Sequence, residues 1–222
     1  CRPLACLDEG LEARTQLDDA FRRAGDIRKQ ALNLSLTATL LALKTHNALA
    51  DAISAKAIAL LDGLTPGPEL ATVHGVEAAL RLFNREYAAS LDWCRQSIAT
   101  ARCFGDTERE LNTRATAVAV TMFLDYARGR AEAQALLEAV RAQGLHATTV
   151  MLLTYMGAAA HEQMHLQEAC TWLHEAVALA SEHELDGSLY YAQALLSHCE
   201  LRRGRWDQAA ERAGLVVERS GV

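Results

Sequence analysis

Residues 87–101 read YAASLDWCRQSIATA, and residues 166–180 read LQEACTWLHEAVALA. Both stretches have apolar residues at i, i+4, i+7, i+11 and i+14, a spacing that places them on one stripe of an α-helix. They are Tyr87, Leu91, Cys94, Ile98 and Ala101, and then Leu166, Cys170, Leu173, Val177 and Ala180. A third copy begins with Trp206, Ala210, Ala213 and Val217. We therefore expect three helices that each bury a single apolar stripe.

Small residues recur along the chain with spacings of 12 and then 7 positions. The triplets are Ala38, Ala50, Ala57; Ala78, Ser90, Ser97; Gly157, Ala169, Ala176; and, with a larger last residue, Ser197, Ala209, Val216. They begin 40, 79 and 40 residues apart, so the middle interval contains one more repeat. In this repeat, two alternatives are open. Ala119, Ala131 and Glu138 are a poorly matching triplet in the expected register, or the register is shifted there by a residue or two. Small residues are expected where paired helices nearly touch, so the pattern predicts an array of antiparallel helix pairs.

The spacing of small residues resembles the tetratricopeptide repeat (TPR). A period near 40 residues, longer helices and the absence of a proline closing the second helix are similar to the MalT-like repeats of large ATP-binding LuxR-type transcriptional regulators. Segments with this character are LDWCRQSIA at 91–99, RGRWDQAA at 203–210 and AGD at 24–26. The resemblance implies a sensing and interaction region, whose nucleotide-binding and helix-turn-helix parts would lie outside these residues.

Short segments that contain glycine, asparagine or proline, residues typical of helix ends and turns, divide the chain into helices. We expect a leading helix at about 8–24 and helix pairs at about 27–45 with 48–62, 68–83 with 85–104, 107–128 with 130–143, 147–163 with 165–183, and 187–203 with 205–219. The predicted fold class is all-α, a right-handed α-solenoid of TPR-like helix pairs that forms a single repeat domain over residues 1–222. Because the chain begins with Cys1 and an unpaired helix, we expect it to be a fragment of a longer protein.

The composition argues against several classes of protein. Three prolines and 5% aromatic residues do not fit the frequent turns and strands of β-sandwiches or barrels. A net charge of −6 with scattered arginines provides no basic face, so this fragment is not expected to bind nucleic acid directly. No apolar stretch approaches the roughly 20 residues that span a membrane.

Six cysteines without a C-x-x-C pair indicate reduced, buried thiols and a cytoplasmic location. Cys94 and Cys103 are nine residues apart, so they should face opposite ways on one helix.

One catalytic pattern is present, because His161-Glu162-Gln163-Met164-His165 matches the H-E-x-x-H motif of zinc hydrolases. That motif needs both histidines on one continuous helix, whereas the repeat register places His165 in the turn between paired helices. We therefore expect no metal, no cofactor and no catalytic residues, with zinc hydrolysis kept as a remote alternative. Walker A, G-x-G-x-x-G and G-x-S-x-G motifs are absent from the sequence.

The inward-facing positions of the first helices define a candidate groove for a ligand or partner. Its members are Ser35, Thr39, Thr72, Met151, Thr154, His161, Tyr191 and His198. The Lys, Arg and Asn residues with which the chaperone-binding subfamily of these repeats clamps a terminal carboxylate are missing at these positions. A neutral surface of small, apolar and hydroxyl residues suits an apolar peptide, another helix or a small uncharged ligand. Inter-helix packing is the alternative role for much of this surface.

These observations predict a non-enzymatic region of a bacterial LuxR/MalT-type regulator that binds a protein partner or small effector in the groove and acts on neighbouring domains. The alternative is a stand-alone TPR scaffold or adaptor in a protein complex. No membrane contact is expected, and homo-oligomerisation is left open.

Overall fold

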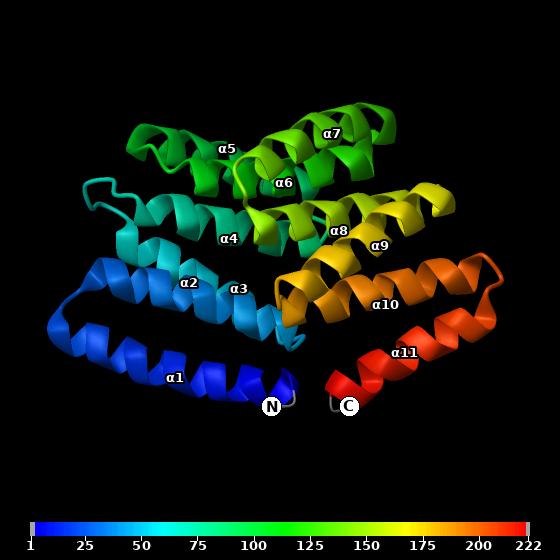
Figure 1. Ribbon diagram of the computed structural model, residues 1–222. Coiled ribbons are helices and arrows are strands. Elements are labelled where there is room, and N and C mark those ends of the chain that lie inside the picture. The colour runs from blue at the N-terminus through cyan, green and yellow to red at the C-terminus, as the bar shows by residue number, and fades with distance from the viewer. Residues whose placement is uncertain (1–2, 221–222) are drawn as a thin grey trace. The chain divides into compact units, whose positions relative to one another are not determined.

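The computed structural model describes residues 3–220, which form eleven α-helices and no β-strand. The helices are α1 (Pro3–Ala24), α2 (Ile27–Leu43), α3 (Asn47–Leu61), α4 (Glu69–Phe83), α5 (Tyr87–Phe104), α6 (Thr107–Leu124), α7 (Tyr126–Ala142), α8 (His146–Glu162), α9 (Leu166–Glu182), α10 (Asp186–Arg202) and α11 (Trp206–Ser220) (Figure 1). They fall into two compact units, Ala5–Arg114 and Ala115–Val222 with Cys1–Leu4, so the division lies within α6. The single domain predicted over residues 1–222 stays a prediction.

The N-terminal unit contains α1, the pairs α2/α3 and α4/α5, and the start of α6. The two first helices, α2 and α4, also pack against each other. Small and branched apolar side chains fill the space between these helices; one cluster consists of Ala38, Leu41, Ala50 and Leu80. The leading helix α1 begins at Pro3, five residues before the predicted start, and proline is well tolerated at the first position of a helix.

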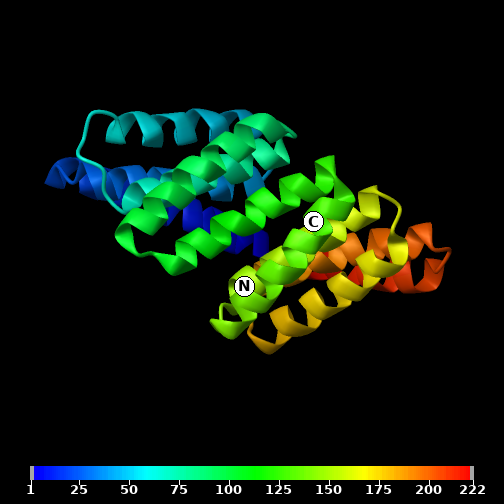
Figure 2. The same ribbon diagram turned by 90° about the horizontal axis from the view of Figure 1, so that it is seen from above.

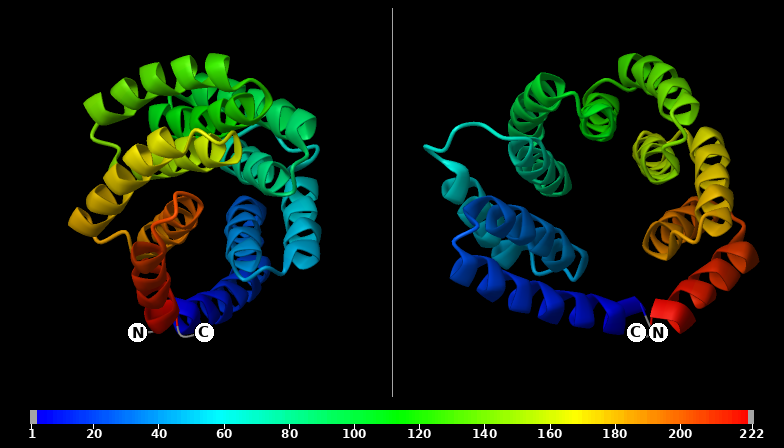
Figure 3. Two further views of the ribbon diagram at one scale, coloured as in Figure 1. Left: turned by 90° about the vertical axis from the view of Figure 1, so that its right-hand side faces the viewer. Right: turned by 60° about the vertical axis from the view of Figure 1, so that its left-hand side comes forward.

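The C-terminal unit contains the end of α6, α7, and the pairs α8/α9 and α10/α11. Figure 2 shows α8 and α9 side by side. The right-hand view in Figure 3 places the first helices α8 and α10 on one side of this unit, and α7, α9 and α11 on the other. Within both units the predicted pairs are present, and four of the five have boundaries within a few residues of those expected.

The small residues lie where paired helices touch, as predicted. Ala38, Ala50 and Ala57 are completely buried. The hydroxyl of Ser90 donates to the carbonyl of Ala78 on the facing helix at 2.7 Å, and Ser197 donates to Ala209 at 2.8 Å in the last pair. At Gly157 a Cβ atom would lie only 2.5 Å from Cγ of Leu173, so a larger residue does not fit.

The third pair departs from the prediction, because α6 ends at Leu124 and α7 begins at Tyr126. Gly129, which was predicted to lie between two helices, lies in the first turn of α7. Asp125 caps that helix, because its side chain accepts a hydrogen bond from the backbone N–H of Arg128 at 3.2 Å. The connection is one residue rather than the three of the other pairs, so the register of α7 is shifted by two residues.

The shifted register replaces the expected small positions with others. Ala119 is buried as expected, but Ala131 and Glu138 are exposed. Their places are taken by Gly129, where a Cβ would come within 2.4 Å of the backbone nitrogen of Met122, and by Leu136, which is 1% exposed. Of the two interpretations of the third triplet, a shifted register is therefore the correct one.

The apolar stripes are buried on two of the three helices for which they were predicted. Cys94 and Ala101 on α5, and Cys170, Leu173 and Ala180 on α9, are at most 3% exposed. On α11 the prediction is wrong: Trp206 is 70% exposed, and Ala210 and Ala213 are also exposed. On α11 the buried residue is instead Ala209, which is 4% exposed and whose carbonyl accepts from Ser197, so the side of α11 that packs on α10 lies beside the predicted stripe.

The shifted register predicts different effects on stability for substitutions at Gly129 and Ala131, two positions of α7 that lie two residues apart. Gly129→Ala should lower the free energy of unfolding by about 3 kcal/mol, because its Cβ would meet backbone atoms of Met122 that cannot move aside. Ala131→Leu should change stability little, since this side chain is exposed. Urea unfolding followed by circular dichroism measures both effects.

The matched control is Gly187→Ala on α10, where a Cβ would meet no heavy atom within 4 Å. We expect this variant to be as stable as the wild type or slightly more stable, because alanine is the better helix former. If Gly129→Ala were stable and Ala131→Leu destabilised, the result would contradict the shifted register and support the unshifted one.

Candidate interaction surface

In the N-terminal unit, the predicted groove residues differ in accessibility. Ser35 on α2 is completely buried, and its hydroxyl oxygen makes no hydrogen bond with the residues that the structure describes. Thr39 is exposed and donates to the backbone carbonyl of Ser35 at 3.4 Å, while Thr72 on α4 is half-buried. Ser35 is thus a packing residue, and Thr39 and Thr72 are the two that a ligand could reach.

In the C-terminal unit, the groove residues lie on α8 and α10, two neighbouring first helices. Thr154 is buried and donates to the carbonyl of Val150 one turn earlier at 2.7 Å, so its hydroxyl is satisfied within its own helix. Met151 is half-buried, and Tyr191 and His198 are exposed. These three side chains form the accessible part of the predicted groove in this unit.

His161 on α8 and His198 on α10 are brought together, with ring centroids 6.1 Å apart and ring planes inclined by 51°. His161 is only 8% exposed, and its Nε2 has no hydrogen-bond partner among the described residues. Burial lowers the pKa of His161, and the positive charge of Arg202 and the neighbouring His198 lower this pKa further. His161 is therefore held in its neutral form at neutral pH.

The H-E-x-x-H segment does not lie on one helix. The helix α8 ends at Glu162, Met164 has a left-handed backbone with φ of 64°, and His165 is the residue that precedes α9. The imidazole of His165 stacks on the ring of Tyr126 with centroids 4.3 Å apart, whereas His161 faces His198. The predicted position of His165 in the turn is confirmed, and no group of three or more His, Cys, Asp or Glu in the described chain is arranged to hold a metal ion.

The cysteines are mostly buried thiols. Cys94, Cys170 and Cys199 are buried and unpaired, and burial raises the pKa of both Cys94 and Cys199 to about 12. Cys94 and Cys199 therefore stay protonated and unreactive at neutral pH. Cys103 is exposed, contrary to the expectation of buried thiols, because it lies on the opposite face of α5 from Cys94. The side chains of Cys1 and Cys6 lie outside the described residues.

Sequence analysis missed two features of the C-terminal unit. The imidazoles of His146 and His183 stack with ring centroids 3.7 Å apart. Both this pair and the pair His161/His198 are separated by 37 residues, and this repeated spacing in the sequence could have predicted that the histidines pair.

A shallow pocket of about 200 Å³ is lined by Val177, Ser181, Leu189, Tyr190, Gln193 and Leu215. It is smaller than the sites that usually bind small molecules.

Comparison with known proteins identifies the fold. No protein-family model and no curated protein matches the chain. The crystal structure of BtubC (BKLC) from P. vanneervenii is similar to it, with a TM-score of 0.59 and 13% sequence identity over 99% of this chain and 90% of that one. Two structures of a putative kinesin light chain from Podosopora anserina, with nearly identical TPR-like repeats, have TM-scores of 0.46 and 0.44 at 15% identity, over 93% of this chain and 92% of each of theirs.

The predicted fold class is confirmed: the chain is an all-α, TPR-like solenoid of helix pairs. At this level of identity the similarity establishes the fold alone. Among the described helices, none combines the length and apolarity required to cross a membrane.

The buried, neutral His161 predicts a pH-dependent stability. Because its pKa is lowered in the folded state, the unfolded chain binds the proton more strongly, and the free energy of unfolding should fall as the pH drops below about 6.5. His161→Gln should make this fall smaller between pH 7.5 and 5. The exposed His174 provides the control, and His174→Gln should keep the wild-type slope. Urea unfolding at several pH values measures the slopes, and equal slopes in all three proteins would contradict the prediction.

The separation of the two motif histidines predicts that zinc does not bind stoichiometrically. After dialysis against zinc and removal of the excess, metal analysis should find much less than one zinc per chain in the wild type and the same amount in His165→Ala. A catalytic site would instead hold both imidazole nitrogens about 2.0–2.1 Å from one ion. About one zinc per wild-type chain, lost in His165→Ala, would support the hydrolase alternative.

Proposed function

We propose that the chain is a non-enzymatic scaffold that binds a protein partner or small effector on the exposed face of its first helices. The observation that carries this proposal is the nature of the accessible groove residues in the C-terminal unit, Met151, Tyr191 and His198. They offer an apolar thioether, a phenol and an imidazole, a combination that suits an uncharged peptide segment or an amphipathic helix.

Two properties support an interaction role rather than a catalytic one. Cys94 and Cys199 are held as thiols by their raised pKa values, and the two histidines of the motif point to different neighbours. The TPR-like fold also provides repeated helix faces of a kind that suits the recognition of extended partners.

The finer proposal is that this scaffold belongs to a LuxR/MalT-type regulator. The period near 40 residues and the long helices support it. In that setting a ligand on the first-helix face would alter how neighbouring domains assemble. A P-loop upstream and a basic helix-turn-helix downstream in the full-length sequence would support the regulator, and their absence would favour a stand-alone scaffold in the cytoplasm.

The proposal predicts a selective effect of Tyr191 on peptide binding. Peptides selected from a random display library against the wild-type chain should be rich in uncharged and apolar residues. Their binding to Tyr191→Arg should be weaker by about tenfold or more, because a charge then enters the accessible groove. Fluorescence anisotropy with purified peptides provides the measurement.

The matched control for this experiment is Thr171→Arg, which adds the same side chain at an exposed position of α9. It should bind the selected peptides as the wild type does. Equal weakening by both variants would show non-specific charge repulsion, and peptides insensitive to Tyr191→Arg would place the binding face elsewhere.

A further inference from the structure

Two histidine contacts with the same sequence spacing lie at opposite ends of α8. His146, the first residue of α8, stacks on His183, and His161, one residue before the end of α8, faces His198 on α10. Each contact spans 37 residues and joins α8 to the segment 183–202, which contains α10. Histidine ordinarily gains or loses its proton between pH 5 and 8, so the surroundings of each pair decide whether acid disturbs the contact.

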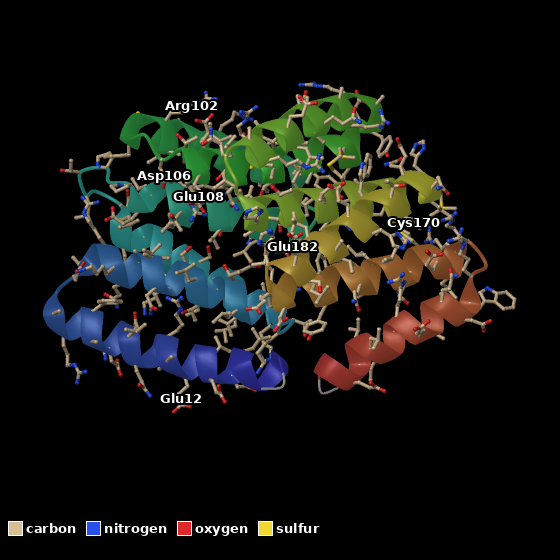
Figure 4. The ribbon with its side chains drawn as sticks, in the orientation of Figure 1. Glu12, Arg102, Asp106, Glu108, Cys170 and Glu182 are labelled. Carbon is tan, nitrogen blue, oxygen red and sulfur yellow. The ribbon has the colours of Figure 1, made fainter. Side chains whose placement is uncertain are left out.

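The pair at the start of α8 lies in surroundings that tolerate a positive charge. His146 is exposed and His183 is half-buried, so solvent and salt screen a charge on either ring. Figure 4 labels the neighbouring Glu182 at the end of α9, and the exposed carboxylates of Glu184 and Asp186 follow it along the chain. Negative charges so close by offset a positive charge on the imidazoles. Acid should therefore leave this contact in place.

The pair near the end of α8 lies in surroundings that oppose a positive charge. His161 is 8% exposed, and its Nε2 has no hydrogen-bond partner among residues 3–220. A protonated imidazole needs an acceptor for each of its two nitrogens, so a proton here would add a buried charge with an unpaired donor. Burial lowers the pKa of His161, Arg202 and His198 lower it further, and the exposed Glu162 opposes them.

Charged groups on the neighbouring helices do not balance a proton on this buried histidine. Residues 115–124 at the adjacent end of α6 carry no charged side chain. On α7, α9 and α10 the charges near this end are paired with one another, Arg130 with Glu168 and Arg205 with Glu200. The packed arrangement of α8 and α10 therefore favours the neutral imidazole.

We propose that the contact of His161 with His198 is an acid-sensitive switch between α8 and α10. With both imidazoles neutral, α10 packs against α8, and a proton on His161 releases α10 and its partner α11 from α8 and α9. The released state binds the proton in water, without the cost of burial, so acid shifts the equilibrium toward it. Release differs from unfolding of the chain, because α8 and α9 stay paired with each other.

Release would also take apart the proposed binding face, since Met151 lies on α8 and Tyr191 on α10. A ligand that contacts both helices would then be lost in acid, because it binds the packed state more tightly than the released one. This consequence rests on the proposed function, whereas the switch itself does not.

Hydrogen–deuterium exchange on the full chain tests the switch without any ligand. Protection of the backbone amides is measured at pH 7.5 and 5.5 and corrected for the intrinsic exchange rate at each pH. In the wild type, the protection of residues 186–220 should fall about tenfold at pH 5.5, since the released state takes up one proton with the ordinary histidine pKa of about 6.5. Residues 146–182 and the N-terminal unit should change by less than about threefold.

Two replacements of the buried histidine separate its effect from that of acid in general. In both His161→Phe and His161→Gln, which cannot take up this proton, the fall for residues 186–220 should shrink to less than about threefold. The matched control is His146→Gln, which removes one ring of the other contact and should keep the wild-type fall. Circular dichroism at pH 7.5 shows whether each variant is folded. Phe retains the ring shape and Gln the polarity, so either folded variant provides the test.

Four outcomes would overturn the switch. The wild type could show no fall in protection, both units could lose protection equally, residues 146–182 could lose as much as residues 186–220, or the His161 variants could retain the wild-type fall. A first-helix face that binds no peptide would leave all four measurements unchanged, so the switch and the proposed function can fail independently.

Discussion

The close approach of the two helices in each pair is the constraint on which the rest of the structure depends. Ser90 and Ser197 each donate a hydroxyl to a carbonyl of the facing helix, and Gly157 leaves room for Leu173. A side chain larger than serine at these positions would separate the helices and break the hydrogen bonds. The size of one residue per helix therefore fixes the distance between paired helices, and with it the positions that can form a core.

Turn length decides which residue occupies that close contact. Three-residue turns with a left-handed middle residue, such as Thr45, Arg85 and Met164, connect the helices of most pairs. The turn at Asp125 has a single residue in an extended conformation, with φ of −144°, so the contact moves to Gly129. Glycine is needed there because the facing atoms belong to the backbone of Met122 and cannot rotate away.

Two surfaces of different character result from this packing. The first-helix face of the C-terminal unit combines Met151, Tyr191 and His198 beside a buried imidazole, and it is the face on which we propose that an uncharged ligand binds. The repeated stripe on α11 is accessible among the described residues, with Trp206 70% exposed.

The sequence by itself determined the fold class, the helix pairing, the period and the position of His165 outside α8, because periodicity and residue size are local properties. It also indicated the candidate groove, but not which of its members a ligand could reach: Ser35 and Thr154 have suitable chemistry and are buried, whereas Tyr191 is exposed. Tertiary structure decided the register of α7, the pairing of His161 with His198, and the exposure of the α11 stripe. Each of these depends on which helix packs against which, and that follows from turn lengths and neighbouring pairs rather than from any single helix.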